Sequence, residues 1–168
     1  HFYRCDFQVH TPRDTQWKGN SSADPGDRKA HAESFVAHCR SADLNAVAIT
    51  DHHDFAYFPF IKQAAAEETH ADGSPYLEHE KLVVFPGLEL TFGQPTIQAI
   101  LILDAHFPED RLADVLKALS VEPVDDSFER LPQVESLDHL KTLLDLHDEL
   151  DKRAWLQGRY IVLPNVTD

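Results

Sequence analysis

Residues 46–54 read AVAITDHHD, a short apolar run followed at once by acidic and histidine side chains. The run from Ala46 to Thr50 has the length and composition of a strand buried on both faces of a parallel sheet. Ligands of parallel α/β folds gather where such strands end. This stretch therefore predicts a central strand with Asp51 and His52 at a ligand-binding edge.

Four more strands of four to seven residues are expected around this one. They are expected at Arg4 to His10, Leu82 to Phe85, Ile97 to Leu103 and Tyr160 to Leu163. The segments between these strands have apolar residues at helical spacing. This alternation of strands and helices predicts right-handed βαβ units around a parallel sheet or barrel. The chain is therefore expected to form one α/β domain over residues 1–168.

The helices between these strands show apolar residues at helical spacing. They are expected at Arg28 to Leu44, Phe55 to Thr69, Pro108 to Leu119, and from an N-cap at Ser136 to a point before Gly158. A polar loop from Thr11 to Asp27 precedes the first helix. Its length favours a functional lid.

The composition excludes some classes of protein. The chain has 15 Lys plus Arg and 29 Asp plus Glu, which gives a formal net charge of −14. This charge argues against a basic module that coats nucleic acid. The basic residues near the expected site, Arg13 among them, are interpreted as a solvated loop. No apolar run approaches the roughly 18 residues of a membrane span, so a cytoplasmic protein without a membrane partner is expected. The absence of methionine, even at residue 1, indicates that these residues were cut from a longer protein.

Polar side chains follow other expected strands as well. His10 ends the first strand, and Glu89 follows the third. With Asp51 and His52 they bring imidazoles and carboxylates to neighbouring strand ends. Such a set predicts a metal site, because these are the usual nitrogen and oxygen ligands of divalent ions.

The strings CDFQVHTP, AITDHHDF and FPGLELTF resemble the first motifs of the polymerase and histidinol phosphatase (PHP) domain. The usual forms of these motifs are D-x-H-x-H-[TS], I-T-D-H and G-x-E. The opening is similar to the PHP domain at the N-terminus of bacterial coiled-coil ATPases of the TrlF-like group. The resemblance covers the first three expected strands.

This resemblance implies a parallel-stranded, distorted β/α barrel of seven strands, of which about five are expected here. Active members hold Zn, Mn or Fe ions that activate water against a phosphate ester, and Mg is a further option. Carried over by motif, His10, His52 and Glu89 are the expected catalytic and metal-binding residues. Asp51 is grouped with them and is expected mainly to orient its neighbours. Asp14 lies near the place of a third-site ligand.

Three carboxamides depart from the family pattern. Gln8 stands at the first histidine of the first motif, Gln98 on the fourth expected strand and Asn165 in the sequence LPNVTD, where relatives carry histidine. An amide oxygen is a weaker ligand than imidazole for Zn or Fe. These three residues are therefore secondary metal candidates, and the metal site is expected to be degraded or empty.

Three hypotheses remain open from the sequence. The preferred one is a degenerate PHP domain, weak or inactive, that regulates a larger ATPase-type protein. The alternative is an active metal-dependent phosphodiesterase or nuclease, and the third is an unrelated α/β domain. Expected partners are the remainder of a larger chain or another subunit, and a phosphate-containing ligand. Nucleic acid is expected to bind only through other regions.

Overall fold

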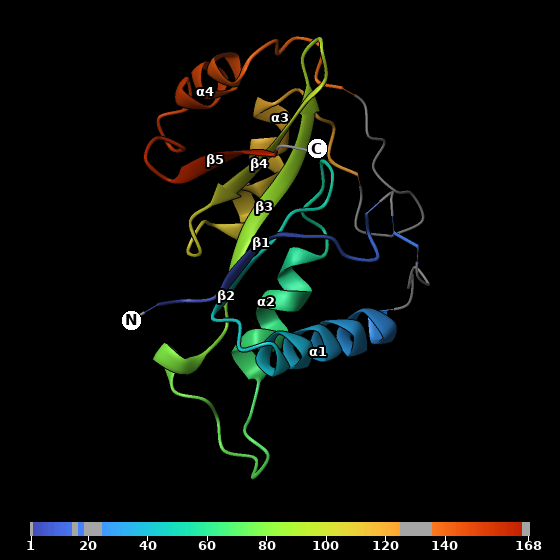
Figure 1. Cartoon of the computed structure of the whole chain (residues 1–168), viewed down its shortest axis with the longest axis vertical. Helices are drawn as coiled ribbons and strands as arrows, with labels where there is room; N and C mark the ends of the chain where they lie inside the picture. Colours follow the sequence, from blue (N-terminus) through green and yellow to red (C-terminus); the bar gives the residue numbers. More distant parts are fainter. Residues whose placement is uncertain (1, 15–16, 19–24, 125–135, 166–168) are drawn as a thin grey trace.

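The computed structural model describes residues 2–14, 17–18, 25–124 and 136–165 (Figure 1). Its centre is a curled sheet of five strands in the order β1-β2-β3-β4-β5. The strands are β1 (Cys5–Val9), β2 (Ala46–Ile49), β3 (Val83–Phe92), β4 (Ile97–Leu103) and β5 (Tyr160–Asn165). The α/β class and the five expected strands are confirmed.

The sheet is mixed, which corrects the expectation of parallel strands throughout. β1, β2 and β3 pair in parallel, whereas β3 with β4 and β4 with β5 pair antiparallel. The physical reason at the first antiparallel pair is the connection: residues 93–96 form a tight turn between β3 and β4. A parallel pair needs a crossover of about a dozen residues or more, so this turn admits only a hairpin.

The third strand is longer than expected and changes partners midway. Residues 83–86 pair with β2, and residues 87–92 pair with β4. Gly87 lies at the change, where an added Cβ would approach the carbonyl oxygen of Leu101 to 2.9 Å. The motif Pro86-Gly87 therefore lies inside β3 and does not end it, so Glu89 lies within the strand.

The helices are α1 (Pro25–Ser41), α2 (Phe58–Glu67), α3 (Leu112–Ala118) and α4 (Leu143–Asp151), with short 3-10 turns η1 (Glu78–Glu80) and η2 (Glu109–Arg111). The expected long helix from Ser136 is wrong. Thr142 is the N-cap, since its side chain accepts a hydrogen bond from the Asp145 backbone N–H at 3.1 Å. Before it, the Leu137 backbone N–H donates to the Thr91 carbonyl at 2.8 Å, which extends pairing to β3 instead of forming a helical turn.

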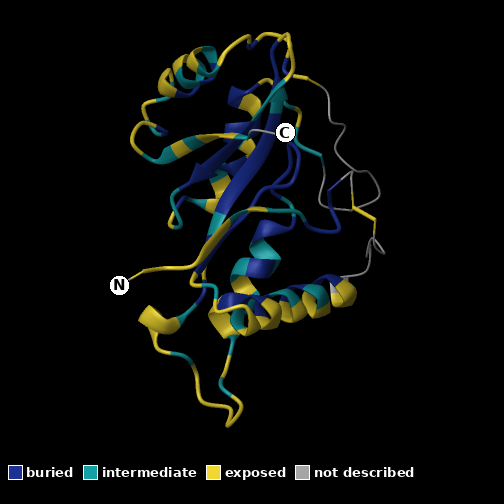
Figure 2. Ribbon diagram, viewed as in Figure 1, coloured by how far each residue is buried: buried dark blue, intermediate teal, exposed yellow. Residues whose placement is uncertain are grey.

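The two faces of the sheet pack against different apolar clusters. Figure 2 shows that β2, β3 and β4 are mostly buried, whereas β5 is partly exposed. Buried helix residues such as Val36 and Ile61 pack with Leu88 and Leu101 in one large cluster. On the other face, Ala48, Ile100 and Ile102 form a small cluster with the half-buried Phe7 and Phe85. Glu89 lies directly opposite Ile100, so it belongs to this second face.

None of the helices in the described part of the chain is long and apolar enough to span a membrane.

Gly87→Ala should lower the free energy of unfolding by about 1–3 kcal/mol, the usual cost of forcing extra atoms into a packed site. The new Cβ would meet Cγ2 of Thr50 at 2.8 Å and the carbonyl oxygen of Leu101 at 2.9 Å. Urea unfolding followed by circular dichroism measures this loss. Adding Thr50→Ser removes the first contact only and should restore part of the stability. Complete restoration would show that the backbone contact does not exclude a side chain here.

Candidate metal centre

The candidate site lies where β1 and β2 end beside the middle of β3. His10 directly follows β1, and His52 follows β2 by three residues. His52 and Glu89 form an isolated parallel bridge, in which the Glu89 backbone N–H donates to the Asp51 carbonyl at 3.2 Å. Backbone pairing therefore holds His52 beside Glu89.

Three predicted ligands converge at this point. The Nε2 atom of His10 lies 3.1 Å from Oε2 of Glu89, and the Nε2 atom of His52 lies 3.7 Å from Oε1. The two imidazole rings stack at 5.2 Å with an interplanar angle of 7°. One ligand atom from each residue lies within 4.8 Å of the others, so the group can hold a metal ion.

Burial of these polar side chains requires that each of their polar atoms has a partner. His52 and Glu89 are each 2% exposed, and His10 is half-buried. The Nε2 atom of His52 is buried without a hydrogen-bond partner among the described residues. Because a buried polar atom normally has a partner, this nitrogen is the one that a bound ion would satisfy.

Asp14 lies on the opposite side of the two rings. Its Oδ2 atom lies 2.9 Å from Nδ1 of His10 and 2.8 Å from Nδ1 of His52. It also accepts the backbone N–H of His52 at 2.9 Å. With His10 and Asp51, Asp14 forms a second group whose ligand atoms lie within 4.8 Å of one another.

Asp51 fixes the loop after β1. One of its oxygens accepts the backbone N–H of Thr11 at 2.7 Å, and the other accepts the Thr11 hydroxyl at 2.6 Å. Burial raises the pKa of Asp51 to about 7, although both hydrogen bonds favour the charged form. This carboxylate therefore ties the end of β2 to the segment that carries Asp14, as expected for a residue that orients its neighbours.

A buried ion pair strengthens the same loop and was missed from the sequence. The Nε atom of Arg13 donates to Oδ2 of Asp54, and both side chains are buried. The interpretation of Arg13 as part of a solvated loop is wrong, because its side chain is fully buried. No periodic pattern in the sequence predicts this contact, because it joins two loops.

The carboxamides differ in what they contact. Gln8 donates through Nε2 to Oε2 of Glu89 at 3.2 Å, and Asn165 donates through Nδ2 to Oε1 at 3.1 Å. Gln98 lies opposite Thr91 and Asn165 in the sheet, and its side chain has no hydrogen bond to any of the described residues. Gln8 and Asn165 are thus part of the cluster around Glu89, while Gln98 is a neighbour in register.

The charges of the cluster are coupled. Hydrogen bonds from the His10 ring to the carboxylates of Asp14 and Glu89 raise the pKa of His10 to about 10. Burial alone would raise the pKa of Glu89, but the hydrogen bond from His10 and the charge of His52 outweigh it and lower the pKa. In the metal-free protein, Glu89 is therefore a carboxylate beside an imidazolium.

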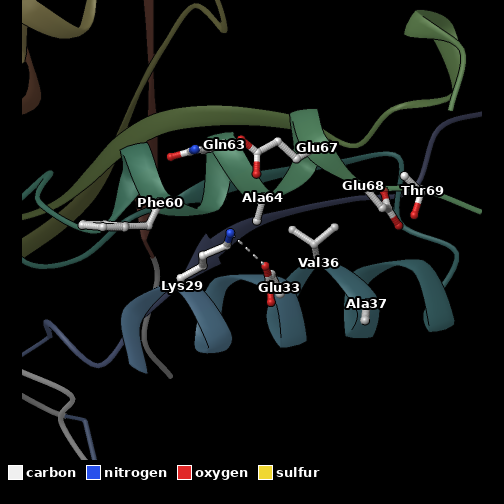
Figure 3. Close-up of a pocket in the computed structure, with 10 residues that line it drawn as sticks. All are labelled: Lys29, Glu33, Val36, Ala37, Phe60, Gln63, Ala64, Glu67, Glu68 and Thr69. Carbon is white, nitrogen blue, oxygen red and sulfur yellow. Dashed lines mark hydrogen bonds and ion pairs between the residues drawn. The ribbon is translucent and has the colours of Figure 1, made fainter. Parts of the chain in front are cut away.

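A separate cavity of about 510 Å³ lies between α1 and α2 (Figure 3). Val36, Phe60 and Ala64 give it an apolar lining, and the pair Lys29 and Glu33 lies at one side with 3.8 Å between charged atoms. None of the predicted site residues lines it. We place the candidate site at Glu89, because the imidazoles and carboxylates converge there.

Comparisons with known proteins find a likeness among solved structures. No protein-family model matches the chain, and no curated protein matches it. Among solved structures, the chain is similar to a proposed metal-dependent phosphoesterase from Bifidobacterium adolescentis, with 18% sequence identity and a TM-score of 0.41. The match covers 70% of this chain and 34% of that chain, so this chain spans about a third of its length. At this level the similarity assigns neither a family nor an activity.

Proposed function

We propose that the chain is a metal-dependent phosphoesterase whose divalent metal is held by His10, His52 and Glu89. The observation that carries the proposal is the convergence of three ligand atoms from separate segments within 4.8 Å. The Nε2 atom of His52 supports it, because this buried atom has no hydrogen-bond partner among the described residues and a bound ion would supply one. The phosphate-ester substrate class comes from the resemblance of the motifs to the PHP domain.

Each residue has a defined task in this proposal. His10 and His52 offer their Nε2 atoms, and Glu89 supplies negative charge between them. A divalent ion bound there would supply Lewis acidity and lower the pKa of a water for attack on phosphorus. Two imidazoles favour Zn or Fe, whereas the carboxylate and nearby amides favour Mn or Mg. Zn²⁺ and Mn²⁺ are therefore the first ions to test.

Glu89→Gln should weaken Mn²⁺ and Zn²⁺ binding by more than about 100-fold, since loss of an outer-shell partner alone costs about 10–100-fold. Calorimetry on chelator-stripped protein measures the affinity. Hydrolysis of p-nitrophenyl phosphate and bis-p-nitrophenyl phosphate should fall in parallel. Glu67→Gln, an exposed carboxylate on α2, is the matched control and should change neither. Equal binding by the Glu89→Gln variant and the unaltered chain would contradict the proposal.

Metal affinity should rise with pH between about pH 6 and pH 8. Because the pKa of His10 is raised to about 10, its ring carries a proton throughout this range. An imidazole ligand must be neutral, so binding must release that proton. One released proton makes binding about tenfold tighter per pH unit. Competition titrations at three pH values test this, and His10→Gln should lose most of the slope. A flat profile for the unaltered chain would exclude His10 as a ligand.

A second candidate function is a degenerate domain that regulates a larger protein without turnover. The observation that favours it is the pair of amide hydrogen bonds from Gln8 and Asn165, one to each oxygen of Glu89. These bonds stabilise the buried carboxylate without a metal ion. Under this proposal, the remainder of a larger ATPase-type chain or another subunit would use the domain as a scaffold.

Reverting Gln8 and Asn165 to His separates the two candidates. If the site is degenerate, the unaltered chain should bind Zn²⁺ weakly, and Gln8→His with Asn165→His should raise the affinity by at least about 100-fold through new imidazole ligands. Equilibrium competition with a chromogenic chelator measures both. Gln63→His, an exposed change on α2, is the control for added histidine. Tight, catalytically productive binding by the unaltered chain would reject degeneracy.

A further inference from the structure

One oxygen atom connects the two candidate imidazole ligands. Oδ2 of Asp14 lies within 2.9 Å of Nδ1 of both His10 and His52. The same atom accepts the backbone N–H of His52 at 2.9 Å. Asp14 itself is 1% exposed, so these groups and not water stabilise this oxygen.

This contact dictates which nitrogen of each ring faces Glu89. An ionised carboxylate accepts hydrogen bonds and cannot donate them, so each Nδ1 must carry its hydrogen toward Asp14. Both Nε2 atoms then point to Glu89, at 3.1 Å for His10 and 3.7 Å for His52. The nearly parallel rings, 7° apart, are consistent with a shared anchor.

The position of Asp14 is itself fixed by the fold. Its backbone N–H donates to the Thr11 carbonyl at 2.9 Å, which closes a turn. Thr11 is held twice by Asp51, and Arg13 is held by Asp54, so both flanks of the turn are attached to residues that follow β2. The loop therefore has little freedom to move Asp14 away from the rings.

We propose that Asp14 is a positioning residue that aligns His10 and His52 together, with both Nε2 atoms directed at the metal position beside Glu89. Its importance for catalysis rests on the proposed function above. Direct ligation by Asp14 is the competing role, since Asp14 also belongs to the group with His10 and Asp51. Positioning is favoured because Oδ2 already lies within hydrogen-bond distance of three nitrogen atoms, one of them the backbone N–H of His52. A carboxylate behind a ligating histidine normally fixes its tautomer in this way.

The first test needs no metal. In uniformly ¹⁵N-labelled, chelator-treated protein, two-bond ¹H–¹⁵N correlation spectra at a pH where the His52 ring is neutral should show hydrogen on Nδ1 and a bare Nε2. Hydrogen on Nε2 of His52 in the unaltered chain would overturn the proposal. This result is independent of the proposed function, because it holds or fails without metal or substrate.

Asp14→Asn is the second test, with Asp104→Asn as its matched control. Both changes replace a paired carboxylate by an amide, but Asp104 pairs with Arg159 at 2.6 Å and lies four residues beyond Ile100, the residue opposite Glu89. Asp14→Asn should move His52 toward the Nε2–H tautomer and weaken Mn²⁺ binding by about 10–100-fold. Asp104→Asn should leave the tautomer unchanged and shift binding by less than about threefold, well below that range.

The outcomes separate the two proposals. Unchanged tautomer and Mn²⁺ affinity in folded Asp14→Asn would overturn the positioning role, as would equal losses in both variants. If the unaltered chain bound no Mn²⁺ or Zn²⁺ but showed hydrogen on Nδ1 of His52, the proposed function would fail while the alignment by Asp14 would stand. If Asp14→Asn did not fold, the spectrum of the unaltered chain would still decide.

Discussion

The buried carboxylate of Glu89 is the constraint on which the rest of the site depends. A charge removed from water is tolerated only where hydrogen bonds and opposite charge replace the lost hydration. Gln8 from β1, His10 after it, and Asn165 from β5 all direct nitrogen atoms at its two oxygens. Strands that are distant in sequence must therefore be paired correctly before this carboxylate is stable, which couples the polar site to the assembly of the whole sheet.

The change of partners along β3 explains how that carboxylate reaches this position. The first half of β3 pairs with β2 and the second half with β4, so Glu89 lies past the end of the β2 pairing and beside His52. Gly87 permits the change because the carbonyl of Leu101 leaves no space for a side chain. The spacing of glycine and glutamate in this motif is thus a packing requirement as well as a chemical one.

Periodicity in the sequence predicted the strands, and the polar residues expected at strand ends predicted the candidate site. Residues 97–103 form a strand with the predicted limits, and His10 and His52 meet Glu89 as expected, although Glu89 lies within β3 and not after it. It did not predict that β4 turns back on β3, because the pattern of a buried strand carries no direction. Ser136 failed as a helix start because the reciprocal bonds of Thr142 and Asp145 form a better cap. The contact of Arg13 with Asp54, and that of Asp14 with both rings, join loops, and local patterns contain no information about such pairs.

At Glu89, hydrogen bonds from the carboxamides of Gln8 and Asn165 compete with metal binding. A carboxylate offers about four lone-pair positions, and in the metal-free protein Gln8, His10 and Asn165 direct hydrogens at three of them. A cation needs lone pairs, so ligation by His10 must remove the proton on its Nε2 atom and break the hydrogen bond from that atom to Glu89. Imidazoles in place of Gln8 and Asn165 would instead direct lone pairs at the ion. The affinity of this site for a metal is therefore the difference between ligation and the hydrogen bonds that ligation displaces, and it must be lower than that of a site with four imidazoles around the same carboxylate.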